Sequence, residues 1–187
     1  MARTLVAGFG NVLRADDGFG VEVVRRLERE LGESRAAIER AGATTGSEAH
    51  AASEGTAGGR PGNGGGGAED VVVAEIGTGG VRLVQELLAG FDRLVIVDAV
   101  ARGGPPGALY VTRLEHVEPV AEIDPHELVP ARALAMARAL GVLPREVFFV
   151  GCEPQQVEEL SLELSPPVRE AVDRAIAEVR RLLAGRF

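Results

Sequence analysis

Five short runs of apolar and β-branched residues recur along the chain, and longer segments with helical periodicity lie between or after them. Each run has a nearly continuous apolar core, which is typical of strands that are covered on both faces. This alternation predicts an α/β protein with a largely parallel sheet. The expected strands span residues 3–8, 70–75, 93–98, 108–113 and 146–151.

The longer segments carry their apolar residues on one helical stripe, as the segment from Val21 to Leu31 does. Thr78 is a candidate cap for the second helix, and Pro130 and Pro167 suit first-turn positions, where a missing N–H costs nothing. The expected helices span residues 19–31, 79–88, 130–140 and 167–183.

The link between the third and fourth expected strands, ARGGPPG, is too short for a crossover helix. We therefore expect these two strands to form an antiparallel pair. The sheet is then mixed, with five strands that are mostly parallel.

A glycine-rich stretch at about residues 42–69 interrupts this pattern. Glycine occupies 8 of the 13 positions from Gly55 to Gly67, and no large apolar residue lies in the stretch. Such a composition cannot bury enough surface to offset the entropy of ordering the chain. We expect a disordered insert in a surface loop of one domain that spans residues 1–187.

The charge balance excludes several classes of partner. Lysine and arginine total 20 against 28 acidic residues, and a net charge of -8 disfavours nucleic acid or an anionic membrane as a partner. The single cysteine, Cys152, cannot form an internal disulfide. No apolar run approaches a membrane span, and the first residues do not resemble a signal peptide. We expect a soluble, cytoplasmic protein.

Acidic residues and one histidine follow the carboxyl ends of the expected strands, where open α/β sheets collect ligands. Asp16 and Asp17 lie in the loop GFGNVLRADDGFG, Asp98 ends the third strand, and His126 lies in DPHEL after the fourth. Two carboxylates and an imidazole from three loops can form a divalent-metal site that suits zinc, nickel or iron.

Each of these residues also has a purely structural interpretation. Asp16 or Asp17 can cap the helix that follows, Asp98 can bond its own backbone in a turn, and His126 can be an exposed residue at a helix start. Cys152 is either a nucleophile or, as we expect, a small buried apolar residue.

A nucleotide site is not expected. The first loop carries only half of the dinucleotide fingerprint GxGxxG, because Leu13 stands at the third glycine position. The chain also contains no lysine, so a phosphate-binding loop of the GxxxxGK[ST] type is excluded.

The loop GFGNVLRADDGFG, the strand VIVDA ending at Asp98–Ala99 and the segment DPHEL around His126 together resemble the hydrogenase maturation endopeptidases. The segments EIGTGG and VGCEP agree as well, and the likeness covers nearly all the chain except the insert.

The resemblance implies a three-layer α/β/α sandwich of the phosphorylase/hydrolase-like kind, with a five-stranded mixed sheet. Carried onto this chain, Asp17, Asp98 and His126 become the metal ligands and the catalytic residues. The implied activity is removal of a C-terminal peptide from the precursor of a nickel–iron hydrogenase large subunit after nickel insertion. Nickel is the implied metal, supplied by the precursor itself or bound as a cofactor. One departure is Asp17, where the family often has glutamate.

The residues around this site suggest further roles. Asp16 is a candidate second acid or general base beside the metal, because its charge would lie next to it. Asn11 is expected to fix the first loop, and the turn from Gly8 to Asn11 is expected to let the precursor backbone come close, since glycine leaves room there. Two rival functions stay open: a metal-dependent peptidase or amidase with an unrelated substrate, and a non-catalytic nickel-sensing assembly factor.

Overall fold

Five strands form the sheet of this protein, whose computed structural model describes residues 2–44, 70–115, 128–185 and 187. Each predicted strand is confirmed, and each begins and ends within two residues of its predicted bounds. The strands are β1 (Arg3–Phe9), β2 (Asp70–Gly77), β3 (Arg93–Ala99), β4 (Leu109–Arg113) and β5 (Glu146–Cys152).

The strands lie in the order β2-β1-β3-β5-β4, with β4 antiparallel to β5 and the other pairs parallel. The predicted mixed sheet is confirmed, but the predicted pairing of the third and fourth strands is wrong. Both edges of β3 are taken by β1 and β5, so the link after β3 crosses the end of β5 instead. The crossing is held where Val100 N donates to Cys152 O at 2.9 Å and Gly107 N donates to Glu153 O at 2.8 Å.

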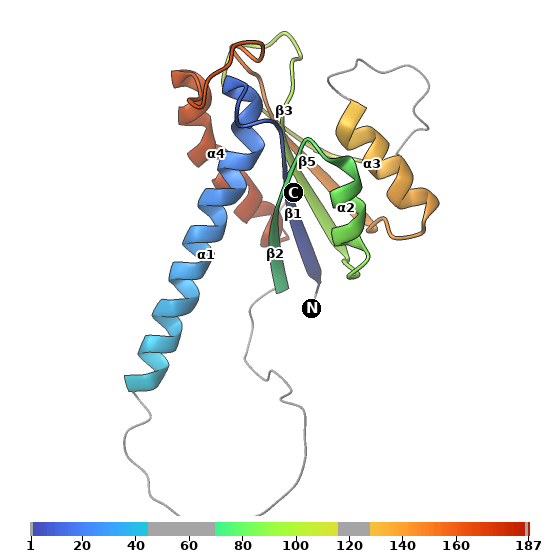
Figure 1. Cartoon of the computed structure of the whole chain (residues 1–187). Coiled ribbons are helices and arrows are strands. Elements are labelled where there is room, and N and C mark those ends of the chain that lie inside the picture. Colours follow the sequence, from blue (N-terminus) through green and yellow to red (C-terminus); the bar gives the residue numbers. More distant parts are fainter. Residues whose placement is uncertain (1, 45–69, 116–127, 186) are drawn as a thin grey trace, which may run out of the picture.

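Helices cover both faces of the sheet, and Figure 1 shows the resulting three layers. On one face, α1 and α4 pack against an apolar cluster that includes Val6, Val97 and Val150. On the other face, α2 and α3 pack against a second cluster around Leu5 and Ile96. The three-layer α/β/α sandwich is thus confirmed. The helices are α1 (Phe19–Thr44), α2 (Gly80–Leu87), α3 (Leu128–Ala139) and α4 (Pro166–Leu183), and a short 3-10 helix, η1 (Ala15–Gly18), precedes α1.

Helix α1 runs to Thr44, although its apolar stripe predicted an end at Leu31. The residues from 33 to 42 are mainly alanine, glutamate and arginine, which have a high intrinsic helix propensity. Periodicity alone therefore placed the end too early. The rest of the predicted insert, residues 45–69, lies outside the described part of the chain.

Two helix starts test the predicted capping residues. Thr78 does not cap α2, because the cap position is Gly79 and no side chain bonds the free N–H groups there. Prolines do occupy the first turns: Pro166 and Pro167 begin α4 after Ser165, and Pro130 is the third residue of α3.

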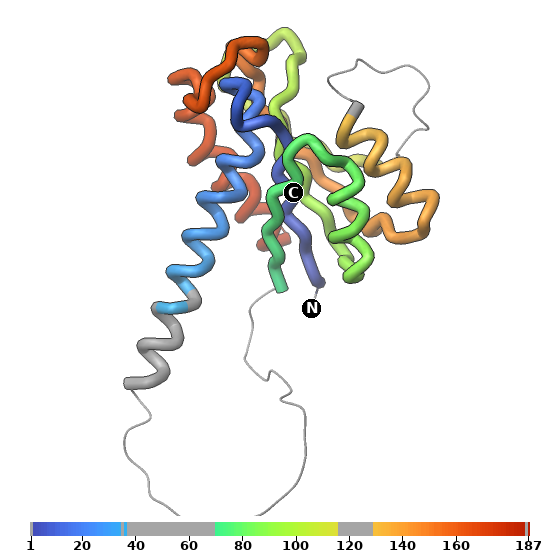
Figure 2. The backbone as a smooth tube through the Cα atoms, viewed as in Figure 1, coloured from blue at the N-terminus to red at the C-terminus, as the bar shows by residue number. Residues whose placement is uncertain are grey.

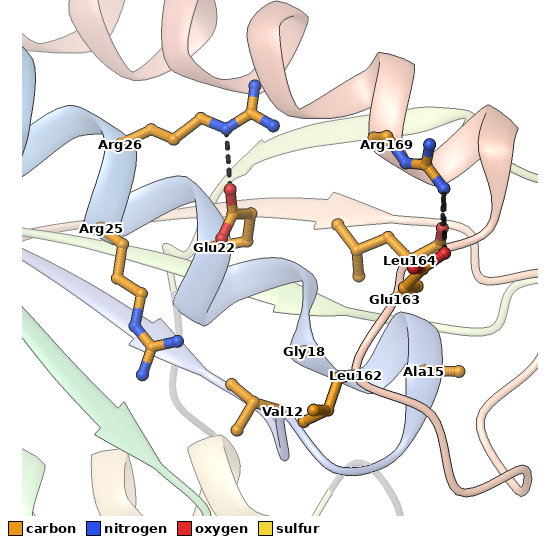
Figure 3. Close-up of a pocket in the computed structure, with 10 residues that line it drawn as sticks. All are labelled: Val12, Ala15, Gly18, Glu22, Arg25, Arg26, Leu162, Glu163, Leu164 and Arg169. Atoms are coloured by element: carbon orange, nitrogen blue, oxygen red, sulfur yellow. Dashed lines mark hydrogen bonds and ion pairs between the residues drawn. The ribbon is translucent and has the colours of Figure 1, made fainter.

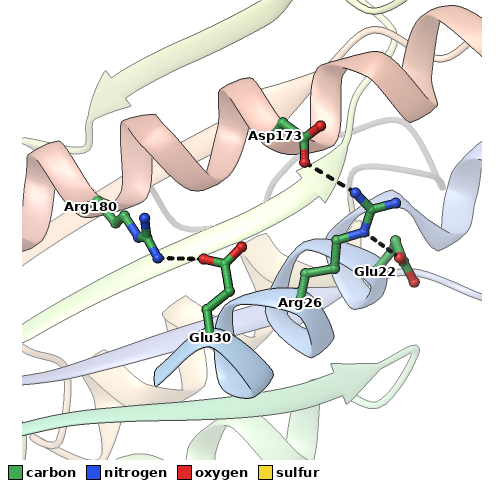
Figure 4. A network of polar contacts seen from close by, with 5 residues as sticks. All are labelled: Glu22, Arg26, Glu30, Asp173 and Arg180. Atoms are coloured by element: carbon green, nitrogen blue, oxygen red, sulfur yellow. Dashed lines mark hydrogen bonds and ion pairs between the residues drawn. The ribbon is translucent and has the colours of Figure 1, made fainter. Parts of the chain in front are cut away.

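Ion pairs join the outer surfaces of α1 and α4 (Figure 4). Arg26 contacts Glu22 at 2.8 Å and Asp173 at 3.1 Å, while Arg180 pairs with Glu30. Exposed pairs of this kind contribute about 1 kcal/mol at most, so the apolar cluster beneath supplies most of the attachment. No helix in the described ranges has the length and apolar character to cross a bilayer.

Candidate functional site

Two glycines, Gly10 in the turn after β1 and Gly20 in the first turn of α1, lie in close contact with neighbouring backbone. A Cβ on Gly10, whose φ is +118°, would lie 1.7 Å from the carbonyl oxygen of Asp17. A Cβ on Gly20 would lie 2.2 Å from the carbonyl oxygen of Val97 and 2.5 Å from that of Phe9. The space at these glycines is filled by this chain's own backbone. At Gly10 the absent side chain thus makes room for this chain's own backbone, and these glycines bring η1 to the end of β3. That the turn from Gly8 to Asn11 also admits the backbone of a substrate stays a prediction.

Asn11 and Asp17 fix this turn together. The backbone N–H of Asn11 donates to Asp17 Oδ2 at 3.0 Å, and the N–H of Leu13 donates to Asn11 Oδ1 at 3.0 Å. The prediction that Asn11 is structural is confirmed. Asp17 is partly buried. Its Oδ2 holds the turn, and its charge lies near the carboxyl end of the sheet.

Asp98 lies on β3 at the same end of the sheet, where the charge of Asp17 affects its pKa. Burial and then the negative charge of Asp17 raise the pKa of Asp98 from 3.8 to about 8, against the opposing effect of the Ala99 N–H. That N–H donates to Asp98 Oδ1 at 2.9 Å, so the predicted bond to the neighbouring backbone is also present. The structure thus brings two of the three predicted site residues together.

A cavity of about 270 Å³ opens beside Asp98, between the sheet and α3. Its walls are mainly apolar, with Ile96, Leu134 and Phe149 among them, and Arg102 lies at its edge. An apolar cavity with a few convergent polar groups is the usual form of a ligand site. The site therefore has room for a peptide side chain next to the acidic pair.

The third predicted residue, His126, lies outside the described residues, as do Asp124 and Glu127 beside it and His50 and His116 elsewhere. Within the described ranges, no group of three or more His, Cys, Asp or Glu side chains is arranged to hold a metal ion. Leu114 and Pro130, on either side of the segment that carries His126, both line the cavity beside Asp98.

Asp16 has a different role from the one expected of it. Its buried carboxylate accepts hydrogen bonds from the N–H groups of Gln155, Gln156 and Ser165 at 2.7 to 3.0 Å, and from Ser165 Oγ at 2.9 Å. These bonds occupy both oxygens and tie η1 to the link between β5 and α4. The interpretation of Asp16 as an acid or base beside a metal is therefore wrong.

Cys152 is fully buried, and burial raises the pKa of its thiol to about 12. A thiol with so high a pKa is not a nucleophile near neutral pH, so the structural interpretation is confirmed.

Glu153, the next residue, was missed by sequence reasoning. It accepts hydrogen bonds from the N–H groups of Arg102 and Gly103 at 2.8 to 3.1 Å and from the Tyr110 hydroxyl at 2.8 Å. Burial raises the pKa of Glu153, but these donors together outweigh it and leave the pKa below its ordinary value. Glu153 thus fixes the link that begins just after Asp98. The signal that marks it is an acid directly after a buried strand.

The protein is thus a three-layer α/β/α protein with two interacting acids, Asp17 and Asp98, at the carboxyl end of its parallel strands. Comparison with known proteins then identifies the family. Residues 65–182 match the model of the HycI family, hydrogenase maturation protease. The chain belongs to the hydrogenase maturation protease family, which makes it a protease and hence a hydrolase.

Individual relatives agree with this assignment. The chain is 28% identical over 185 residues to the hydrogenase expression/formation protein HupD of Bradyrhizobium diazoefficiens, covering 97% of this chain and 78% of the relative. It is 30% identical over 184 residues to HupD of Rhodobacter capsulatus, covering 97% and 71%. Among solved structures, the hydrogenase maturating endopeptidase HybD from Escherichia coli has a TM-score of 0.68 at 27% identity, over 98% of this chain and 93% of that one.

Proposed function

We propose that this protein is the endopeptidase that removes a C-terminal peptide from the precursor of a nickel–iron hydrogenase large subunit after nickel insertion. One observation carries the proposal: Asp17 lies close enough to Asp98 for its charge to raise the pKa of the Asp98 carboxyl, in a chain of the hydrogenase maturation protease family. In this proposal nickel belongs to the substrate, because the precursor presents it to the enzyme.

The proposed site for recognising the metal consists of Asp17, Asp98 and His126. Two carboxylate groups and one imidazole suit nickel, zinc or iron. Burial and Asp17 raise the pKa of Asp98 to about 8, and a cation beside these two acids would favour their ionised forms. The acidic pair therefore fits a cation. The part played by His126 stays a prediction from the sequence.

The metal, when bound, can polarise the scissile carbonyl or lower the pKa of an attacking water. The residues of this chain contribute position and a group that can exchange a proton. Without a metal, the Asp98 carboxyl, whose pKa is about 8, holds a proton at pH 7. A cation bound beside Asp98 would displace that proton, and the ionised carboxylate would then hold the metal and could accept a proton from an attacking water. The cavity that Asp98 lines would hold the precursor chain next to this group. These roles make the protein an endopeptidase of the aspartate/metal type.

The decisive experiment measures the intact mass of the large-subunit precursor from the same genome, with and without nickel, before and after incubation with this protein. We expect one discrete C-terminal peptide to be lost, only from the nickel-loaded precursor. Asp98→Ala serves as the inactive control, since it removes one of the two acids.

Two other outcomes would each replace the proposal. An unchanged mass with measurable binding would indicate a non-catalytic assembly factor. An unchanged mass without binding, together with cleavage of metal-free peptides, would indicate a peptidase with an unrelated substrate.

A further inference from the structure

Three leucines close to the candidate site are exposed to solvent. The exposed fractions are 57% for Leu13, 82% for Leu160 and 77% for Leu162. Leu13 lies in the turn between β1 and η1, and the other two lie in the link between β5 and α4. Single exposed leucines are ordinary, but a group of them on one surface commonly marks an interaction site.

The turn after β1 and the link between β5 and α4, which carry these leucines, are hydrogen-bonded to each other, and their backbones can be followed in Figure 2. The N–H of Ser161 donates to Leu13 O at 3.1 Å, and the N–H of Ala15 donates to Ser161 O at 2.9 Å. Leu160 and Leu162 flank Ser161, which is paired with Arg14 in a parallel bridge. Figure 3 shows the side chain of Leu162 next to Val12, in the first of these segments. We call Leu13, Leu160 and Leu162 the leucine patch.

The leucine patch is held rigidly. The link from 153 to 165 contains no helix or long strand, yet the buried carboxylate of Asp16 accepts three of its N–H groups and the hydroxyl of Ser165. A buried carboxylate is tolerated where hydrogen bonds compensate the loss of hydration, and these four bonds fix the two ends of the link that carries Leu160 and Leu162. A rigid apolar surface loses little entropy on binding, so this arrangement favours recognition of a partner.

The leucine patch also adjoins the candidate site. Leu13 and Asp17 belong to the same turn, which Asn11 and Asp17 hold through their hydrogen bonds. A protein that rests on the leucine patch would therefore have its neighbouring segments within reach of Asp17 and Asp98.

Charged residues at the border of the leucine patch indicate the kind of partner. Glu158 and Glu159 are exposed, and within the described ranges neither takes part in an ion pair. Glu163 has a distant contact of 3.9 Å with Arg169. A partner that fits this surface has an apolar patch with lysine or arginine at its border.

We infer that the leucine patch is the docking surface for the folded body of the large-subunit precursor, separate from the site that takes its C-terminal segment. The inference rests on the proposed function, because it identifies the partner as the substrate. A second copy of this chain fits less well. A two-fold contact through the patch would bring the Glu158–Glu159 pairs of both copies to one interface, where like charges repel.

The test compares two double variants in binding and processing of the nickel-loaded precursor. Leu160→Gln with Leu162→Gln alters the leucine patch, and Leu88→Gln with Leu140→Gln alters two exposed leucines at the ends of α2 and α3 as the matched control. We expect the patch variant to raise the Kd and the KM about tenfold with kcat unchanged, and the control to match wild type. Thermal unfolding should be within a few degrees for both, since all four leucines are exposed.

Substitution of the charged residues beside the leucine patch is a second, independent test. Glu158→Lys with Glu159→Lys should slow association with the precursor and reduce its dependence on salt, whereas Glu28→Lys with Glu33→Lys, on α1, should change association less. If the wild-type protein binds the precursor without cleaving it, the proposed function is overturned, but the Kd values of the variants still test the docking surface. Cleavage by wild type with an unchanged Kd in the patch variant would overturn only the docking surface. A wild-type dimer in sedimentation that the patch variant loses would also overturn it.

Discussion

Burial, and after it the negative charge of Asp17, raises the pKa of the Asp98 carboxyl from 3.8 to about 8. The Ala99 N–H, which donates to Asp98 Oδ1 at 2.9 Å, opposes this effect without cancelling it. Two acids that hinder each other's ionisation lower the stability of the native state. Proteins retain such pairs mainly where binding or catalysis requires them, so this relationship marks the site more clearly than either residue alone.

We expect Asp98→Asn to stabilise the protein, by an amount that grows with pH. The unfolded chain releases the Asp98 proton near pH 3.9, whereas the native state keeps it until about pH 8. The stability contributed by this proton is complete below about pH 4 and is lost as the pH rises to about 8. Thermal unfolding should therefore show a Tm difference between variant and wild type that widens by several degrees from about pH 5 to pH 8.5.

A matched substitution separates this effect from the loss of a carboxylate in general. Asp173→Asn removes an exposed acid on α4, far from Asp98 in the sequence and on a different element. Its Tm difference from wild type should change little over the same range. A difference for Asp98→Asn that stays constant with pH would contradict the prediction.

Local patterns predicted the strands because each one is a short run rich in apolar and β-branched residues, bounded by polar residues or glycine. They did not predict which strands are neighbours. The position of β4 beyond β5 depends on β3 being occupied at both edges and on Glu153 holding the link, and neither appears in the sequence of β3 or β4. The end of α1 was missed because its apolar stripe ends at Leu31, whereas residues of high helix propensity continue beyond it.

The candidate site was predicted in the same uneven way. Asp16 and Asp17 are identical neighbours in the sequence, and only their partners distinguish them. Asp16 is bonded to residues at 155, 156 and 165, which are too distant along the chain for any local pattern to show. Asp98 was predicted from its place at the end of a buried strand, which is a local property. His126 stays a prediction, because it lies outside the described residues.

Asp16→Ala should destabilise the protein strongly. The substitution leaves the buried N–H and hydroxyl groups of Ser165 without their acceptor, together with the part-buried N–H groups of Gln155 and Gln156. Each unsatisfied buried donor costs about 1–3 kcal/mol, so we expect a loss of about 3 kcal/mol or more in urea unfolding. If Asp16 were instead a surface acid beside the site, the variant would lose processing and keep its stability.

Gly20→Ala should disrupt the site through the backbone. The new Cβ would lie 2.2 Å from Val97 O, and the strand that carries this oxygen cannot move without moving Asp98. We expect a loss of about 3 kcal/mol or more in urea unfolding, with processing lost as well.

Gly32→Ala is the matched control for this change, since it lies on the same helix with no atom within 4 Å of the new Cβ. It should raise stability by about 0.5–1 kcal/mol through helix propensity. Equal effects of the two substitutions would show that the close contact at Gly20 has no energetic role.

Ala131→Leu tests whether the cavity beside Asp98 takes part of the substrate. Ala131 lines this cavity from α3, so a leucine there fills apolar space without introducing a polar group. We expect processing of the nickel-loaded precursor to fall about tenfold or more, while thermal stability stays equal or rises, because added apolar surface is buried. Ala139→Leu, at the exposed end of the same helix, should process at the wild-type rate. Mass spectrometry of precursor and product over time measures both variants, and a wild-type rate for Ala131→Leu would show that the precursor chain does not enter the cavity.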